Sequence, residues 1–240
     1  MIEVKTSPTS WSRITVETVH RTRLAGPEAS LYPLAKRWTD VIIAVLLLFL
    51  LSPIMALIAL AIRLDSPGPV IFRQERVGQF GRTFIMLKFR SMYMNADEQV
   101  HRQFAKQYIN GFASKGSSIQ GQTVFKPNGD KRITRVGKWL RRTSLDELPQ
   151  LINVLRGEMS LIGPRPAVRY EVEEYSPWHM QRLTVPPGLT GLAQISGRSG
   201  LTFDKIVRLD IEYIQRRSLA LDMAILFKTI PVVLQAKCTA

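Results

Sequence analysis

The stretch "VIIAVLLLFLLSPIMALIALAI", residues 41–62, contains no charged side chain and decides the fold of the chain. At about 1.5 Å rise per residue, a straight helix over this stretch would roughly match the ~30 Å hydrocarbon core of a bilayer. The alternative is a buried core helix, but soluble helices seldom lack a polar face over such a length. A signal peptide is disfavoured because the mostly polar residues 1–40 precede the stretch. We therefore predict a membrane-inserted helix.

The middle of this stretch is interrupted by Ser52 and Pro53. Proline removes a backbone donor and clashes with the preceding turn, although simple proline kinks also occur in spanning helices. The flanks are basic on both sides, with Lys36 and Arg37 before the stretch and Arg63 after it, so the positive-inside rule favours neither orientation. A re-entrant helix that bends at Ser52 and Pro53 and returns to the same membrane face satisfies both observations.

Composition divides the chain into three parts. We expect a polar N-terminal tail, a re-entrant membrane helix and a membrane-associated globular domain, at residues 1–35, 36–63 and 64–240. The globular part predicts an α+β fold that is mostly helical. Its first element should be a β-hairpin, because "PVIFRQERVGQFGRTFIMLKFRSM" places apolar, β-prone runs on either side of Gly78 and Gly81.

Two segments of the globular part have both a helical pattern and an end signal. In "NADEQVHRQFAKQYING", residues 95–111, Asn95 is the expected N-cap. In "LPQLINVLR", residues 148–156, the following Gly157 is a typical helix stop. We expect a helix in each.

The rest of the globular part combines loops with one long helical pattern. Residues 203–234 have a helical pattern with a strongly apolar second half, and we expect Pro231 to bend or end that helix. Residues 114–131 and the proline- and glycine-rich stretches "GPRP" and "VPPGLTGLAQISGRSG" predict loops. Loops held by a scaffold often carry function.

The charge balance indicates an anionic partner. The chain of 240 residues has 33 Lys and Arg against 19 Asp and Glu, a formal charge of +14. Such an excess suits nucleic acid, an acidic membrane surface or a phosphorylated substrate. The single cysteine, Cys238, cannot form an internal disulfide, and the few histidines form no zinc-type cluster in the sequence.

The strongest chemical signal is "KRITRVGKWLRRTSLDELPQ", in which a run of cations precedes the adjacent carboxylates Asp146 and Glu147. Pro149 suits the first turn of a helix, so both acids should lie at a helix N-terminus, where the macrodipole and the cations favour ionised carboxylates. Ser144 and Glu147 also have the spacing of a capping box, which is the simpler explanation of that spacing alone. A capping box, however, requires neither Asp146 nor the cations.

An aspartate among cations can act on phosphorus. An ionised aspartate can attack a phosphoryl group and form an acyl phosphate, which splits one difficult transfer into two easier ones. The transferring group carries spread negative charge that arginines and Mg²⁺ stabilise. The pattern therefore predicts a site in which cations bind a phosphorylated substrate and allow an anionic nucleophile to approach it.

Several motifs occur in order along the chain. They are Lys36 to Asp40, the break at Ser52 and Pro53, "KFRSM", "RRTSLDELPQLINVLRGEMSLIGPRP", "PPGLTGLAQISGR" and "LDIEYIQRRSLALD". In these motifs the chain resembles the bacterial monotopic phosphoglycosyl transferases, and the pairing of "LDELPQ" with "MSLIGPRP" is highly specific. The predicted fold is accordingly a re-entrant helix hairpin joined to a small cytosolic catalytic domain with a β-hairpin and interfacial amphipathic helices.

This resemblance implies a reaction at the cytoplasmic face of the bacterial inner membrane. A sugar-1-phosphate would move from a UDP-sugar to undecaprenyl phosphate, releasing UMP and initiating exopolysaccharide, capsule or another glycan. The implied partners are the UDP-sugar, undecaprenyl phosphate and the lipid bilayer. We expect no nucleic-acid partner, and a homo-oligomer remains compatible with the sequence.

The resemblance also assigns roles to residues. Asp146 would be the nucleophile and a Mg²⁺ ligand, and Glu147 would support metal and substrate. Phosphate or nucleotide binding would fall to four cations, Lys88, Arg141, Arg165 and Arg198, although the same arginines could instead be structural ion-pair partners. Ser196 stands where many relatives have asparagine, so the sugar stays undecided.

Two other classes remain in competition. A membrane-anchored basic module that binds anionic lipid or RNA would explain the charge but not the acidic pair. A membrane phosphatase that forms an acyl phosphate would consume the lipid phosphate without a sugar donor. Turnover of a UDP-sugar with release of UMP separates both from a transferase.

Overall fold

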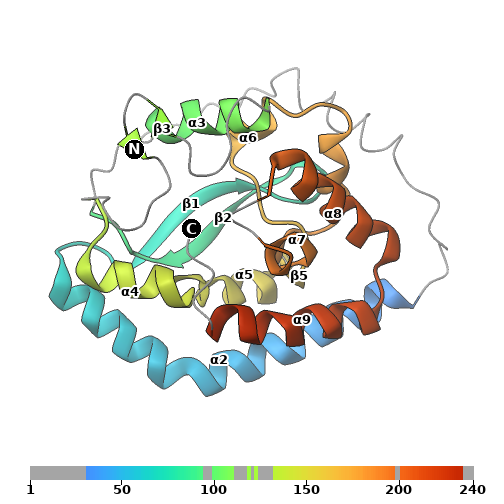
Figure 1. Cartoon of the computed structure of the whole chain (residues 1–240). Helices are drawn as coiled ribbons and strands as arrows, with labels where there is room; N and C mark the ends of the chain where they lie inside the picture. The colour runs from blue at the N-terminus through green and yellow to red at the C-terminus, as the bar shows by residue number, and fades with distance from the viewer. Residues whose placement is uncertain are drawn as a thin grey trace, which may run out of the picture.

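The computed structural model describes residues 31–93, 99–110, 118–119, 122–123, 132–197 and 201–234. In Figure 1 a two-stranded ribbon lies in the middle of the molecule, and helices α4 (Arg135–Thr143) and α5 (Gln150–Arg156) lie beneath it. Helices α2 (Tyr32–Asp65) and α9 (Leu219–Leu234) form the lower edge. The expected N-cap Asn95, the cation Arg198, the tail at 1–30 and most of the 114–131 loop lie outside the described residues.

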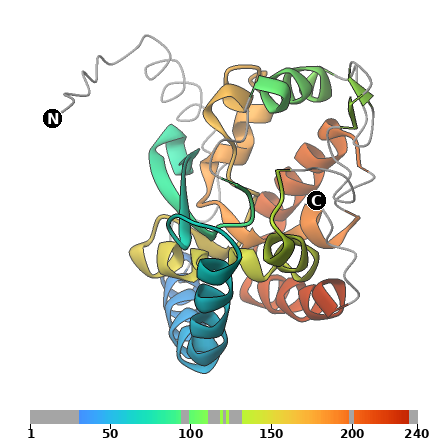
Figure 2. The ribbon, with the colours of Figure 1, turned by 90° about the vertical axis from the view of Figure 1, so that its left-hand side faces the viewer.

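The apolar stretch forms one long helix, α2 (Tyr32–Asp65), which begins before and ends after the predicted limits of 36–63. Figures 1 and 2 show α2 bent into two arms that both rise toward the globular body from a common lowest point. Pro53 lies inside the helix and leaves the carbonyl of Phe49 without its usual i+4 donor. The Ser52 hydroxyl donates to that carbonyl at 2.8 Å, as a polar side chain near a proline break can do.

The N-terminal arm of α2 is fixed to the globular body by polar contacts. The Arg37 guanidinium donates to the carbonyl oxygens of Val154 (2.6 Å) and Leu155 (2.8 Å) at the end of α5 (Gln150–Arg156). The buried carboxylate of Asp40 accepts from the hydroxyl of Ser160 at 2.7 Å, on strand β5 (Ser160–Ile162). These contacts hold the start of α2 against the elements that carry the "LDELPQ" and "GPRP" motifs.

The C-terminal arm is fixed to the same body. Arg90, which follows strand β2, donates to the backbone oxygens of Ile62 (3.3 Å) and Ser66 (2.6 Å), where a cation suits the C-terminal carbonyls of a helix. The Asp65 carboxylate accepts from the backbone N–H of Val136 in the first turn of α4 (Arg135–Thr143) at 3.1 Å. Both ends of the apolar helix are thus anchored to one globular body.

The predicted hairpin is confirmed as strands β1 (Ile71–Val77) and β2 (Thr83–Phe89), joined by the short helix η1 (Gln79–Gly81). The strands are antiparallel, and Arg76 lies opposite Phe84 while Phe72 lies opposite Lys88. Because side chains alternate between faces along a strand, Arg76 and Lys88 point to the same face of the ribbon.

The free edge of β2 is completed by a side chain of α5. Asn153 accepts from the backbone N–H of Leu87 at 3.0 Å and donates to the carbonyl of Ile85 at 2.8 Å. The asparagine is fully buried, so it takes the place of a third strand at an edge that would otherwise be unpaired. The predicted stop at Gly157 is confirmed, because Gly157 adopts the left-handed conformation (φ 79°) after Arg156.

The two proline- and glycine-rich stretches lie side by side. Strand β5 pairs in parallel with β6 (Gly188–Thr190). A Cβ on Gly188 would collide with the backbone of Gly163, so only glycine permits this close approach. The "GPRP" loop that begins at Gly163 is therefore held tightly by the "PPGLTG" stretch.

The remaining elements are one longer helix and several short helices and strands. The predicted helix in 95–111 is described as α3 (Gln99–Ile109). The short elements are β3 (Ser118–Ile119), β4 (Gln122–Thr123), α6 (Arg169–Val172), η3 (His179–Thr184) and α7 (Leu192–Ile195). Figure 2 shows α3 at the end of the molecule opposite the bend of α2.

The single long helix expected at 203–234 is wrong in one respect. The segment forms two helices, α8 (Phe203–Arg216) and α9 (Leu219–Leu234). The hydroxyl of Ser218 accepts from the backbone N–H of Leu221 at 3.2 Å, so a new helix is capped there. Pro231 does not end α9, which continues to Leu234.

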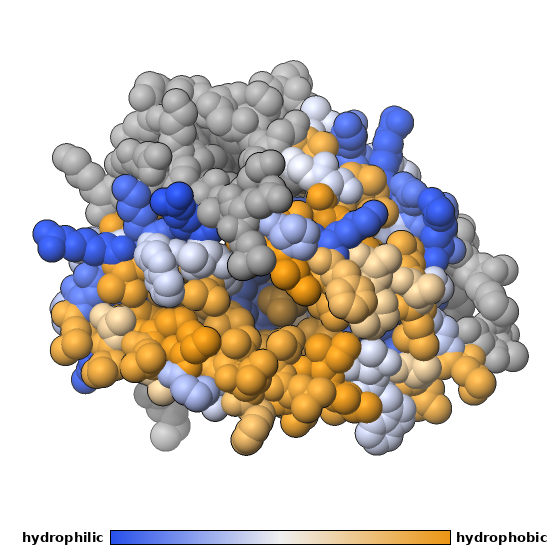
Figure 3. Space-filling view, turned by 60° about the horizontal axis from the view of Figure 1, so that its bottom comes forward, coloured by the Kyte–Doolittle hydropathy of each residue, from blue (hydrophilic) through white to orange (hydrophobic). Residues whose placement is uncertain are grey.

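The surface of α2 is apolar where it leaves the globular body. Only 11% of the residues in its most apolar stretch are buried. The side chains of Phe49 and Leu50 are 82% and 70% exposed. Phe227 and Ile230 of α9 are also exposed. Figure 3, seen from the side of α2 and α9, shows a wide hydrophobic surface. A core helix of a soluble protein would bury such residues, so the exposed surface favours membrane insertion.

Candidate active site

The two acids lie between helices α4 and α5, in the short 3₁₀ helix η2 (Leu145–Glu147). Ser144 has a left-handed conformation (φ 58°) that turns the chain between α4 and η2. No side-chain capping bond is formed by Ser144, so the capping-box explanation of the S-x-x-E spacing is wrong. Pro149 precedes α5 directly, which agrees with the expected position at a helix start.

Glu147 collects two of the predicted cations. Its Oε1 lies 3.2 Å from the Lys88 Nζ and 3.3 Å from an Arg165 guanidinium nitrogen. Lys88 comes from β2, Glu147 from η2 and Arg165 from the "GPRP" loop, so three separate elements meet at one carboxylate oxygen. Asp146, the neighbour of Glu147, is buried and only 8% exposed.

Burial dominates the electrostatics of Asp146. It raises the pKa of the Asp146 carboxyl, against the charge of Lys88, and the adjacent Glu147 raises it further. Arg141 and Arg165 oppose this rise. The sequence predicted that cations would favour the ionised carboxylate, and it missed the larger effect of desolvation. A carboxyl with a raised pKa among several cations is typical of a functional site.

Burial also acts on Lys88. It lowers the pKa of the Lys88 ammonium, while the carboxylate of Glu147 raises it and the charge of Arg165 lowers it. The ion pair with Glu147 therefore opposes the effect of burial and favours the charged ammonium.

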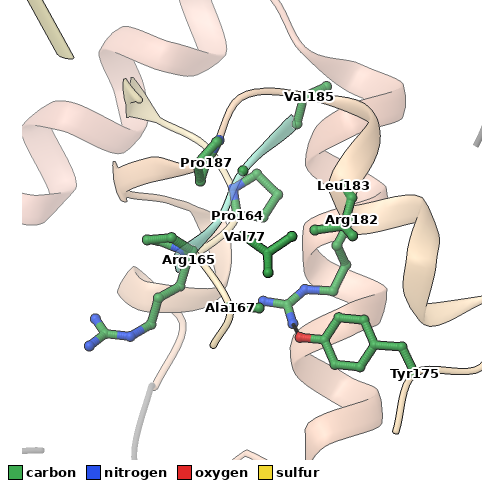
Figure 4. Close-up of a pocket in the computed structure, with 11 residues that line it drawn as sticks. Val77, Pro164, Arg165, Ala167, Tyr175, Arg182, Leu183, Val185 and Pro187 are labelled. Carbon is green, nitrogen blue, oxygen red and sulfur yellow. Dashed lines mark hydrogen bonds between the residues drawn. The ribbon is translucent and has the colours of Figure 1, made fainter. Parts of the chain in front are cut away.

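Arg165 lines two hollows. Figure 4 shows the first, in which Val77, Pro164 and Leu183 form apolar walls and the guanidinium of Arg165 extends away from the centre. The other arginine of this hollow, Arg182, makes structural contacts with neighbouring side chains. It donates to the Tyr175 hydroxyl at 2.7 Å, as Figure 4 shows, and pairs with the buried Asp210 at 2.7 Å.

The second hollow holds the cation cluster. Its lining includes Arg76, Lys88, Glu147, Gln150 and Arg165. The sequence reasoning did not name Arg76 or Gln150 as site residues. Arg76 could have been found, because an antiparallel register across the hairpin puts it on the same face as Lys88. Gln150 lies four residues after Asp146, a spacing that brings side chains to one side of a helical segment.

Not all predicted site residues join the cluster. Arg141 influences Asp146 electrostatically, but its guanidinium donates to the Ser91 hydroxyl at 3.1 Å and lies 3.7 Å from the Met92 sulfur. Arg198 lies outside the described residues, so its assignment stays a prediction. Ser52 and Pro53 lie inside the apolar helix α2.

A family model described as bacterial sugar transferase matches residues 31–236, which is most of the chain. The chain belongs to this family. The chain is 42% identical over 200 residues to the exopolysaccharide production protein ExoY of Sinorhizobium fredii, and the match covers 83% of the chain and 85% of that relative.

Two longer relatives carry names that state a reaction. The undecaprenyl-phosphate galactose phosphotransferase of Salmonella typhimurium is 42% identical over 200 residues, which cover 83% of the chain and 40% of that relative. The UDP-glucose:undecaprenyl-phosphate glucose-1-phosphate transferase of Escherichia coli is 42% identical over 212 residues, which cover 85% of the chain and 41% of that relative. The chain thus spans less than half the length of both relatives.

Proposed function

We propose that the protein transfers a sugar-1-phosphate from a UDP-sugar to undecaprenyl phosphate and releases UMP, as the first step of exopolysaccharide or related glycan assembly. The observation that carries this proposal is the buried Asp146 beside two cations from separate elements, Lys88 of β2 and Arg165 of the "GPRP" loop, which both pair with Glu147. The names of the relatives, which state galactose and glucose-1-phosphate transfer to undecaprenyl phosphate, give the same reaction class.

The reaction proceeds in two displacements. A carboxylate oxygen of Asp146 attacks the phosphorus that bears the sugar, and the bond from that phosphorus to the bridging oxygen of UMP breaks. UMP leaves with that oxygen and its electron pair, and the sugar phosphate is bound to Asp146 as an acyl phosphate. An oxygen of undecaprenyl phosphate then attacks the same phosphorus, which releases the Asp146 carboxylate and forms the lipid diphosphate sugar.

Lys88 and Arg165 have different roles in binding the negative charge of the substrate. Lys88 is buried and fixed by Glu147, so it presents a positioned positive charge next to the nucleophile. Arg165 is 43% exposed at its side chain and contacts Glu147 from the "GPRP" loop, so it can grip phosphate oxygens with two nitrogens. Glu147 orients both cations, and its charge limits their pairing with Asp146.

The donor set is compatible with Mg²⁺. Within the described residues there is no group of three or more His, Cys, Asp or Glu that could hold a metal by itself. Mg²⁺ commonly uses one or two carboxylates together with substrate phosphates and water, so Asp146 supported by Glu147 fits a metal that arrives with the donor. When bound, the ion would supply positive charge to the diphosphate.

We also propose that α2 enters and leaves the membrane on the cytoplasmic face. Contacts of Arg37 and Asp40 at one end, and of Asp65 and Arg90 at the other, fix both ends to one body. A globular body cannot occupy both sides of a bilayer, so a helix anchored in this way returns to its starting face. The bend and the exposed apolar arms support this topology.

A donor panel tests the reaction. Purified protein in lipid nanodiscs with Mg²⁺ is given undecaprenyl phosphate and, in turn, UDP-glucose, UDP-galactose, UDP-N-acetylglucosamine and UDP-N-acetylgalactosamine. We expect UMP release that depends on both substrates with at least one donor. Inorganic phosphate released from the lipid without any donor would instead identify a phosphatase, and binding without turnover would identify a binding module.

A further inference from the structure

Gln150 occupies the first position of α5, four residues after the proposed nucleophile, and its side-chain Nε2 has no hydrogen-bond partner among the described residues. The side chain is 2% exposed, and its Nε2 makes no hydrogen bond within the described part of the chain. Buried amide N–H groups are nearly always paired, and an unpaired one destabilises a fold. A donor held in this way is explained when a ligand supplies the missing acceptor.

The chain around Gln150 makes an anion the suitable ligand. Gln150 lines the second hollow together with Arg76, Lys88 and Arg165. Glu147 is the one carboxylate among the lining residues, and it is shared by Lys88 and Arg165. Three cations line the hollow with one carboxylate, and they still exceed the carboxylates when the nearby Asp146 is counted.

Arg76 contributes most clearly to this excess. Its guanidinium donates to the side-chain oxygen of Gln74 and to the carbonyl of Pro166, both of which are neutral acceptors. Burial lowers the pKa of Arg76, and the charge of Arg165 lowers it further. An anionic ligand in the hollow would relieve this repulsion between two arginines.

We propose that Gln150 is a further substrate-binding residue, whose Nε2 donates a hydrogen bond to an oxygen of the sugar-bearing phosphoryl group. The inference rests on the proposed function, with Asp146 as the nucleophile. A carboxamide suits this position because it donates without carrying charge. It can therefore hold a phosphoryl oxygen close to Asp146 without forming an ion pair with the nucleophile, which an additional lysine or arginine would do.

The proposal distinguishes between nucleotides. The sugar-bearing phosphoryl group takes part in both displacements, so Gln150 serves the formation of the Asp146 adduct and its transfer to the lipid. UDP retains the corresponding phosphate, whereas UMP lacks it. A Gln150 variant should consequently weaken inhibition by UDP and leave inhibition by UMP unchanged.

The test uses Gln150→Met, which keeps the length of the side chain and removes the N–H donor. With donor alone, we expect adduct formation to slow by about 100- to 1,000-fold, the range for removal of one donor to a developing anion. Transfer from the adduct to undecaprenyl phosphate should slow similarly. The Tm without ligands should be equal or higher, because an unpaired buried N–H is removed.

Gln79→Met is the matched control. The Nε2 of Gln79 donates to the carbonyl of Thr184 at 3.0 Å, away from the cation cluster. The same chemical change should therefore lower the Tm and leave adduct formation within about twofold of wild type. The two variants should show opposite patterns in stability and in activity.

The outcomes separate the two proposals. Gln150→Met with wild-type adduct formation, or with equal losses of UMP and UDP inhibition, overturns the role of Gln150 while the proposed function stands. A Tm loss in Gln150→Met as large as that in Gln79→Met also overturns it, because the side chain would then be structural. Wild-type protein that forms no phosphosugar adduct with any donor overturns the proposed function, and this inference with it.

Discussion

The Lys88 ammonium and the Glu147 carboxylate lie 3.2 Å apart, immediately beside the buried Asp146. Glu147 rather than Asp146 accepts from Lys88 and from Arg165. This arrangement keeps the cations in place and preserves the nucleophilic carboxylate for the substrate. It also gives the two neighbouring acids separable roles.

Glu147→Gln should slow adduct formation without abolishing it. The amide keeps the shape but loses the charge that holds Lys88 and Arg165, so both cations can pair with Asp146 and weaken it as a nucleophile. We expect a loss of roughly 10- to 100-fold in the rate of UMP release. Wild-type rates in this variant would show that the ion pairs have no part in the reaction.

Asp146→Asn should abolish transfer and leave the protein folded and membrane-bound. The carboxamide cannot form the covalent intermediate, and removal of a buried charge should not lower the free energy of unfolding. Intact-mass measurement after incubation with donor alone should show a phosphosugar adduct in the wild type, mapped to Asp146, and none in the variant. Near-normal turnover by Asp146→Asn would end the covalent mechanism.

Arg165→Ala should impair donor use more than Arg165→Lys, and neither should release the protein from membranes. A guanidinium can bind two phosphate oxygens at once, whereas lysine supplies a point charge. The KM for the UDP-sugar and the membrane-bound fraction should be measured for both variants. If loss of membrane binding is the main defect, Arg165 contacts lipid headgroups instead.

Asn153→Leu should lower the free energy of unfolding by about 1–3 kcal/mol, because two backbone groups of β2 lose their buried partners. Lys88 lies on the same strand, so the rate of adduct formation should fall as well. Chemical denaturation in detergent measures the first effect. Asn110→Ala, at an exposed site, is the control and should stay within about 0.5 kcal/mol of wild type.

The membrane topology can be tested with single cysteines in a Cys238→Ser background. Leu31 and Leu64 flank the apolar stretch and are 80% and 79% exposed, whereas Ser66 is buried and unsuitable for labelling. Cysteines at both sites should resist a membrane-impermeant thiol reagent in intact spheroplasts and react after lysis. Labelling of the Leu31 site alone in intact cells would show a full span.

A double substitution addresses the bend within the same topology. Ser52→Ala with Pro53→Ala restores a backbone donor for Phe49 and removes the ring clash, so α2 should straighten toward a span. Activity should fall, although neither residue lies in the cation cluster.

Much of the local structure follows from short-range signals in the sequence. The hairpin around Gly78 and Gly81 and the end of α5 at Gly157 depend on turn and cap chemistry, and both are confirmed. The split between α8 and α9 also had a local signal, the capping hydroxyl of Ser218, which the long apolar pattern of the segment concealed.

The missing parts depend on contacts between distant segments. The sequence shows Arg37 as a basic flank of the apolar stretch and as part of the Lys36 to Asp40 motif, yet the residue binds the end of α5, more than a hundred residues away. The pairing of Asn153 with β2 likewise requires knowledge of which helix covers the strand edge. The raised pKa of Asp146 follows from burial, which periodicity alone does not give.

The double anchoring of α2 has a consequence for the kind of lipid layer that the protein requires. A re-entrant helix whose two ends are held by one globular body, as proposed, contacts the acyl chains of one membrane leaflet and does not reach the headgroups of the other. Bilayer thickness would then be irrelevant to it, in contrast to a spanning helix, for which hydrophobic mismatch carries a free-energy cost. A phospholipid monolayer on an oil droplet should accept the folded protein as readily as a vesicle does.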